Sequence, residues 1–141
     1  MAKADITLTI SGGEMAGEYM RFDPGSALRA DVQIIPQDAV KHRAIRVSVE
    51  WHTEGYGNRD HADAEVTFLA HDGMLQPGAP IYQQVSFTLP NEPWSYAGNL
   101  INVIWQVKAT IDIAMGKDIE AAQTFILAPR EARAPLELAA R

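Results

Sequence analysis

The stretch "LPNEPWSYAGNLINVIWQVKATIDI", residues 89–113, joins a proline-rich turn directly to a long run of alternating apolar residues. In its second half every odd-numbered residue from Ile101 to Ile113 is apolar, and most of the even-numbered residues are polar. Alternation with a period of two is typical of a strand with one buried face. The run from Asn99 would extend about 50 Å at ~3.3 Å per residue, enough to span a whole sandwich. We therefore expect one fold-spanning strand with Trp105 at the centre of its buried face.

The segment before this strand predicts a crossing from one sheet to another. Pro90 and Pro93 have no N–H group, so they cannot donate to a β-ladder. The chain should therefore leave one sheet here and enter a second sheet at Gly98. We expect Trp94 and Tyr96 to pack as a lid over the end of the core, in a structural role rather than against a ligand.

Strand-like patterns recur in seven other segments, with Gly, Pro or Asp turns between many of them. These segments are residues 6–10, 18–22, 28–34, 45–52, 66–70, 85–89 and 119–127. Before residue 130, the sequence shows no convincing helical period. About eight strands, each with one apolar face, predict an all-β fold that forms an antiparallel β-sandwich. Trp51 is the expected packing partner of Trp105, with both residues in the core.

Length and composition are typical of one globular domain, which we expect to cover residues 1–128. The chain has 141 residues and 47% of them are hydrophobic, enough to bury a substantial core. Residues 129–141 are instead rich in Ala, Glu and Arg. We expect this tail to be poorly ordered or to hold one short helix beginning at Pro135.

Charge and cysteine content narrow the range of functions. The net charge of −6 repels phosphate backbones, so we expect no nucleic-acid partner. The chain has no cysteine, which excludes disulfides, thiolate metal sites and a cysteine nucleophile and fits a reducing compartment. The first ten residues lack the apolar core of a signal peptide, and no transmembrane or membrane-inserting segment is predicted. We expect a cytoplasmic protein.

The run from Phe87 to Leu127 resembles the arrestin-like superfamily. Its "FTLPNEPWSYAG" resembles the family's crossover, "WQVKA" the aromatic-x-V-x-A centre of the long strand, and "GKD" the turn before the terminal strand. Upstream, "DPGSALRADVQI" and "RAIRVSVEWHTEGYG" resemble two further strands of the family, so the match extends from about Phe22 to Leu127. The resemblance implies an immunoglobulin-like β-sandwich with a non-catalytic adaptor or scaffold role.

The departures from the family pattern limit what can be transferred. Arrestins carry two such sandwiches, whereas this chain has room for one. The sequence holds no PPxY motif, and Lys3 is the only basic residue near the first strand, where the family's phosphate sensor lies. The resemblance is therefore to a stand-alone, prokaryote-like arrestin-fold domain without phosphoreceptor binding.

Candidate catalytic and metal-binding residues give weak signals. Asp60, His61 and Asp63 could offer one nitrogen and two oxygen ligands, but they share one loop without a framework spacing, so a solvated polar loop is favoured. Glu50 lies on an outward strand face, where cross-strand ion pairing is the ordinary role. Neither a G-x-S-x-G context nor a phosphate-loop pattern is present. We expect no enzyme activity, no cofactor and no metal.

The expected partner is another protein, and a homo-oligomer stays open. The outward faces of the two best-patterned strands are polar apart from Ile104, so recognition should fall to sheet edges and end loops. The richest loop is "TEGYGNRDHAD", residues 53–63, which offers an aromatic anchor, adaptable glycines and mixed charge. The predicted partner-binding residues are Tyr56, Asn58, Arg59, Asp60 and His61.

Two alternatives accompany this prediction. A carbohydrate-binding sandwich would use exposed aromatic residues such as Tyr56 and Trp94 as a stacking platform, so burial of Trp94 would argue against it. The basic run from Lys41 to Arg46 could bind an anion, but the favoured interpretation is a loop followed by the polar face of an edge-accessible strand.

Overall fold

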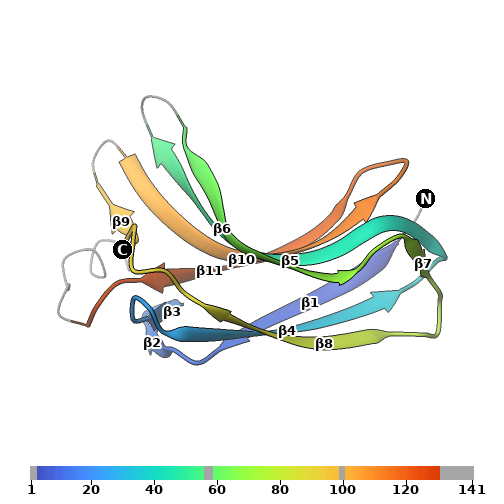
Figure 1. Cartoon of the computed structure of the whole chain (residues 1–141), viewed down its shortest axis with the longest axis horizontal. Coiled ribbons are helices and arrows are strands. Elements are labelled where there is room, and N and C mark those ends of the chain that lie inside the picture. The colour runs from blue at the N-terminus through green and yellow to red at the C-terminus, as the bar shows by residue number, and fades with distance from the viewer. Residues whose placement is uncertain (1–2, 56–58, 99–100, 131–141) are drawn as a thin grey trace.

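The computed structural model describes residues 3–55, 59–98 and 101–130 of the chain (Figure 1). Within these ranges it contains eleven strands and no helix: β1 (Ala4–Ser11), β2 (Glu14–Ala16), β3 (Tyr19–Phe22), β4 (Ala27–Pro36), β5 (Val40–Gly55), β6 (His61–Ala70), β7 (Gly73–Leu75), β8 (Ile81–Thr88), β9 (Tyr96–Ala97), β10 (Ile101–Ile113) and β11 (Ile119–Leu127). Eight of them correspond to the eight predicted segments. The other three, β2, β7 and β9, have only two or three residues, too few to show an alternation in sequence.

Two sheets face each other as the layers of a β-sandwich (Figure 1). The smaller sheet has the order β1-β4-β8, and the larger has the order β2-β3-β11-β10-β5-β6, with β7 added to β5 and β9 to β10. The all-β sandwich is confirmed, with one departure from the antiparallel expectation. β3 pairs in parallel with β11, because the N-terminal part of the chain runs alongside its last described strand.

The larger sheet curves away from the smaller one at both ends, so its outward face is concave (Figure 1). The inward faces of the two sheets form the hydrophobic core. No helical segment within the described ranges has the length and apolar character needed to cross a membrane.

Trp105 is a core residue, as predicted, with none of its surface exposed. Its direct neighbour across the β5–β10 ladder is Trp51, which confirms the predicted inward register of both strands. Trp51, however, is only partly buried against the core. On its other side it faces Ala62 of β6.

The predicted crossover between the sheets is confirmed, but the chain enters the larger sheet at Tyr96, in β9, rather than at Gly98. Hydrogen bonds attach the crossover to the core. Trp105 Nε1 donates to the carbonyl oxygen of Pro93 at 2.7 Å. The backbone N–H of Ser95 donates to the carbonyl of Leu127 at 2.8 Å, and the N–H of Leu127 donates to Ser95 Oγ at 2.9 Å. These bonds attach the crossover to both β10 and β11.

The expected lid of Trp94 and Tyr96 is wrong, since the two side chains are 45% and 49% exposed. Ser95 lies between them and is 7% exposed, directed inward by its bonds to Leu127. Successive side chains of an extended backbone point to opposite sides, so an inward Ser95 turns both aromatic residues outward.

Candidate functional site

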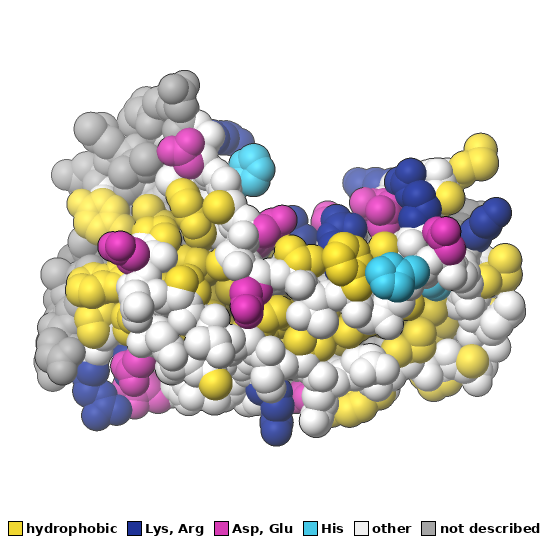
Figure 2. All heavy atoms as spheres, viewed as in Figure 1, with side chains coloured by type: hydrophobic (Ala, Val, Ile, Leu, Met, Phe, Trp, Pro, Cys, Tyr) yellow, Lys and Arg dark blue, Asp and Glu magenta, His cyan; other side chains and the backbone are white. Residues whose placement is uncertain are grey.

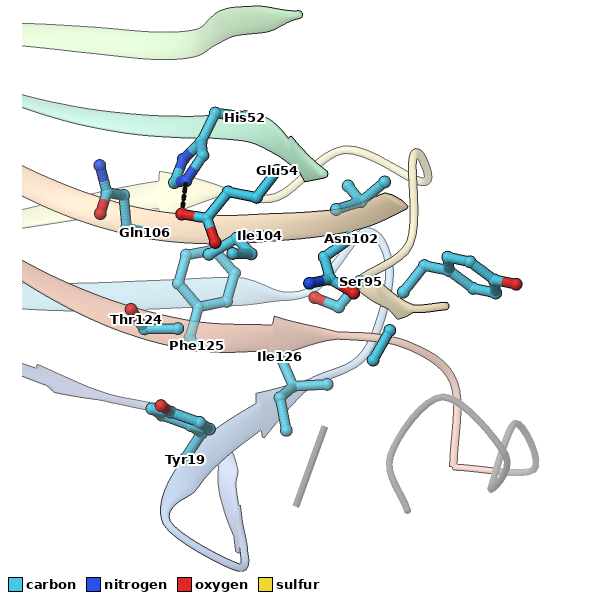
Figure 3. Close-up of a pocket in the computed structure, with 13 residues that line it drawn as sticks. Tyr19, His52, Glu54, Ser95, Asn102, Ile104, Gln106, Thr124, Phe125 and Ile126 are labelled. Atoms are coloured by element: carbon cyan, nitrogen blue, oxygen red, sulfur yellow. Dashed lines mark hydrogen bonds and ion pairs between the residues drawn. The ribbon is translucent and has the colours of Figure 1, made fainter. Parts of the chain in front are cut away.

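A groove of about 400 Å³ lies on the outward face of the larger sheet, where β9 replaces β11 as the neighbour of β10 (Figure 3). Strands β3, β5, β9, β10 and β11 all contribute to it. Its lining includes Tyr19, His52, Glu54, Ser95, Tyr96, Ile104 and Ile126.

The groove exists because β11 changes partner along its length. Up to Phe125 it pairs with β10, and from Phe125 to Leu127 it pairs with β3. The end of β11 therefore separates from β10, and β9 pairs with Asn102 and Val103 of β10 in its place. Ser95, bonded to Leu127, holds β9 in this position.

The groove combines apolar and polar surfaces. Ile104 from β10 and Ile126 from β11 provide apolar side chains, with Tyr19 on the side of β3. On the side of β5, His52 Nε2 lies 3.0 Å from Glu54 Oε2, and Figure 3 shows this pair directed toward the groove. Apolar surface with a few placed polar groups is typical of binding sites.

Sequence reasoning missed this groove, although one signal was present. Ile104 was the single apolar residue on an otherwise polar strand face, and the structure places it in the groove lining. The other contributions come from strands that approach one another only in the folded chain.

The predicted partner-binding loop lies beside the groove. Tyr56 and Asn58 fall outside the described residues, and Arg59, Asp60 and His61 are all exposed. Much of the predicted loop is strand, because β5 continues to Gly55 and β6 begins at His61.

Thr53 closes the described base of this β5–β6 hairpin. Its backbone N–H donates to the carbonyl of Asp60 at 2.9 Å, and its hydroxyl accepts the N–H of Asp60 at 2.8 Å. A second hollow of about 470 Å³ is lined by His52, Thr53, Glu54, Arg59, Asp60 and His61. His52 and Glu54 line both hollows, so the two hollows adjoin at these side chains.

The candidate metal ligands do not converge. In the part of the chain that the structure describes, no three His, Asp or Glu side chains form a cluster suited to a metal ion. Asp63 lies opposite Glu50, and His61 lies opposite His52 on the next outward position of the ladder. Carboxylate and imidazole ligands must surround an ion, so residues spread along one strand are poor candidates.

The groove does contain a His–carboxylate pair, which a nucleophilic mechanism could use if a hydroxyl were within reach of it. Ser95 is the buried hydroxyl of the groove, but its oxygen accepts the N–H of Leu127. Within the described ranges, Glu54 is the hydrogen-bond partner of His52, and no serine hydrogen-bonds to its ring.

The basic run from Lys41 to Arg46 belongs to β5, an interior strand, so its description as a loop and an edge-accessible strand is wrong. Arg43 Nη2 lies 2.8 Å from Asp112 Oδ1, and Arg46 Nη1 lies 3.8 Å from Asp112 Oδ2. An anion at this place would have to compete with the carboxylate of Asp112.

Further along the concave face, Glu50 confirms its predicted cross-strand role. Its Oε1 accepts a hydrogen bond from Gln106 at 2.7 Å and lies 3.0 Å from Lys108 Nζ. The curvature brings these outward side chains together, and Figure 2 shows acidic and basic groups along the concave face of the larger sheet. The outward residues Ser48 and Thr110 are consequently buried, which a flat polar face would not predict.

We expect the stability of the protein to fall as Glu50 is protonated. Burial raises the pKa of Glu50, but the hydrogen bonds from Gln106 and Lys108 and the charge of Lys108 outweigh it, so the net pKa lies below the ordinary 4.5. Because its folded-state pKa is lowered, ionised Glu50 stabilises the fold at pH values above its unfolded pKa of about 4.5. This stabilisation is lost as the pH falls through the folded-state pKa. Urea midpoints measured from about pH 6 to pH 3 should therefore decline less steeply in Glu50→Gln than in the unmodified chain.

Glu120→Gln is the matched control, since Glu120 also faces Lys108 but at 3.7 Å and with 49% of its side chain exposed. Its acid dependence should stay close to that of the unmodified chain. Identical pH profiles for Glu50→Gln and the unmodified chain would contradict the prediction.

Comparison with known proteins identifies the fold, but sequence comparison assigns no family. No family model matches the chain, and no curated protein matches its sequence. Among solved structures it is similar to Spo0M, a sporulation control protein from Bacillus subtilis, with 20% identity and a TM-score of 0.65. The alignment covers 92% of this chain and 50% of that one, so the chain spans about half the length of that structure. The fold is an arrestin-like β-sandwich.

Proposed function

We propose that this chain is a non-catalytic, intracellular protein-interaction module, an adaptor or scaffold, whose partner binds along the groove and the adjoining β5–β6 hairpin. The observation that carries the proposal is that His52 and Glu54 line both hollows, which adjoin at these side chains. The name of Spo0M as a sporulation control protein supports a regulatory role. The absence of cysteine fits a reducing compartment.

The lining indicates the kind of partner segment that would fit. The Ile104 and Ile126 side would receive an apolar anchor, and the half-exposed Tyr96 could cover it from the side. His52, Glu54 and the charged residues of the hairpin would bind polar groups that flank the anchor. Interfaces commonly combine such an apolar centre with a polar rim.

We expect two substitutions to remove partner binding while the fold stays intact. Ile104→Lys places a charge in the groove, and exchange of residues 56–60 for a Gly/Ser linker removes the hairpin tip. Each variant should capture at least about tenfold less partner from lysate, as measured by quantitative mass spectrometry and then by direct titration of the purified partner. Melting temperatures should change little, because Ile104 lies outside the core cluster.

Phe68→Ser is the matched control, since Phe68 is 53% exposed on the same outward face but pairs with Arg46, several residues from the groove. Its partner capture should equal that of the unmodified chain. Full capture by both groove variants would refute the proposal.

A carbohydrate-binding role is the second candidate, because Trp94 is 45% exposed. Its Nε1 donates to the carbonyl of Asn91 at 2.9 Å, which orients the ring, and an oriented indole can stack on a sugar face. Tyr56, the other proposed platform residue, lies outside the described residues. Binding to a glycan library that is lost in Trp94→Ala and retained in Ile104→Lys would favour this role over the protein partner.

A further inference from the structure

Strand β8 is an outer strand of the smaller sheet with a regular backbone. It pairs with β4 from Ile81 to Thr88, opposite Ile34 to Ala27, without a register shift. Its other side faces no paired strand in the part of the chain that is described. The backbone N–H and C=O groups on that side can pair with another extended chain, and this chemistry alone specifies a strand as the occupant.

The β6 edge of the larger sheet is built differently. β6 has two register shifts against β5, opposite Ile45/Arg46 and Val49/Glu50, and it carries the acidic residues Asp63 and Glu65. Bulges and charges are common means by which natural proteins prevent edge-to-edge pairing. β8 has neither, since "IYQQVSFT" contains no charged residue and no proline. The other outer strand of the smaller sheet, β1, is also regular but carries the charged Asp5, so β8 is the better suited of these edges for pairing.

The sequence of β8 is suited to pairing with itself. In an antiparallel arrangement centred on Gln84, that residue meets Gln84 of the second copy, and Tyr82 meets Ser86 of the second copy. The inward residue Ile81 meets Phe87 of the second copy, so core-facing side chains stay on one face and exposed side chains on the other. This match makes the contact isologous, as a two-fold dimer requires.

The absence of charge on β8 lowers the electrostatic cost of bringing a second copy to this edge. Two chains of net charge −6 repel each other over most of their surfaces, but an uncharged strand adds no like charge at the point of contact. We propose that two copies of this chain pair through their β8 edges and join their smaller sheets into one continuous six-stranded sheet. This proposal is independent of the groove on the other sheet.

The first experiment measures association of the full chain by sedimentation velocity from about 1 µM to about 1 mM. The unmodified chain should form a concentration-dependent dimer. The double variant Gln84→Lys/Ser86→Lys should dissociate at least about tenfold more readily, because it opposes like charges across the two-fold axis. Its melting temperature at low concentration should change little, since both side chains are exposed and the attraction of a lysine at position 84 to Asp31 opposes the repulsion of a lysine at position 86 from Arg29.

Val66→Lys is the control, because it adds a lysine at an exposed position of β6, an outer strand of the larger sheet. It should leave the dimer intact. A chain that stays monomeric at every concentration, or a dimer that the double variant leaves unchanged, would overturn the proposal.

The second experiment uses the absence of native cysteine. In Gln84→Cys, mild oxidation should yield a disulfide-linked dimer, since directly opposed antiparallel residues have Cα atoms about 4.5–5.5 Å apart. Val66→Cys should not cross-link. Preferential cross-linking of Val66→Cys would place the contact on β6 and refute the β8 pairing. Monomers whose β8 amides become protected from exchange only with an added extended peptide would assign the edge to a different chain and equally refute it.

Discussion

Trp105→Ala is expected to lower the free energy of unfolding by about 3–5 kcal/mol, a large share of the stability of a small domain. Trp105 is fully buried, and its ring lies 5.9 Å from that of Phe125 between centroids. Its indole N–H also satisfies the carbonyl oxygen of Pro93 at 2.7 Å. The substitution therefore opens a cavity and removes the hydrogen bond that joins the crossover to the core.

The midpoint of guanidinium unfolding measures this effect. Trp51→Ala is the matched control, because Trp51 lies directly opposite on β5 but is only partly buried. Its effect should be smaller, about 1–3 kcal/mol. A Trp105→Ala variant that unfolded at the midpoint of the unmodified chain would show that the inward register of β10 is wrong.

Arg21→Met is expected to destabilise the protein by about 2–4 kcal/mol. The Arg21 side chain is 4% exposed, and its guanidinium donates to the carbonyl of Ala128 and to the carboxylates of Glu14 and Asp23, each at 2.6 Å. Methionine fills much of the volume but donates no hydrogen bond. The carbonyl of the fully buried Ala128 would lose this donor, whereas the two exposed carboxylates could be solvated by water.

Arg43→Met is the appropriate comparison, since Arg43 also pairs with a carboxylate, Asp112 at 2.8 Å, but is 59% exposed. We expect it to change stability by about 1 kcal/mol or less. Chemical denaturation of both variants in urea gives the two values directly. Equal losses would mean that the buried hydrogen bond to Ala128 contributes little.

The sequence predicted the elements that depend only on residues close together in the chain. Alternation of apolar and polar residues follows from the two-residue repeat of an extended backbone, so the eight longer strands and the inward position of Trp105 could be read directly. Pro90 and Pro93 cannot donate to a ladder, which located the crossover. Prediction failed where the direction of a side chain depends on a contact with a residue far along the chain. The outward positions of Trp94 and Tyr96 follow from Ser95, whose partner Leu127 is 32 residues further along the chain.

The candidate site shows the same division. Ile104 stood out as an apolar residue on a polar strand face, but its surroundings come from β3, β9 and β11, which meet only in the folded chain. The residues of the hairpin were identifiable by composition, whereas their position beside the groove was not. Composition describes the side chains available, and the pairing of distant strands decides which of them share a surface.

By itself, then, the sequence determined the strand positions, the inward faces of the sandwich and the crossing between its sheets, because each depends on backbone geometry within a few residues. Tertiary structure alone decided the parallel pairing of β3 with β11, the separation of β11 from β10 that opens the groove, and the outer position of β8 among the described strands. It also decided the burial of Arg21, whose carbonyl partner Ala128 is 107 residues away. Contacts across such separations arise from how whole strands pack, and no local pattern records them.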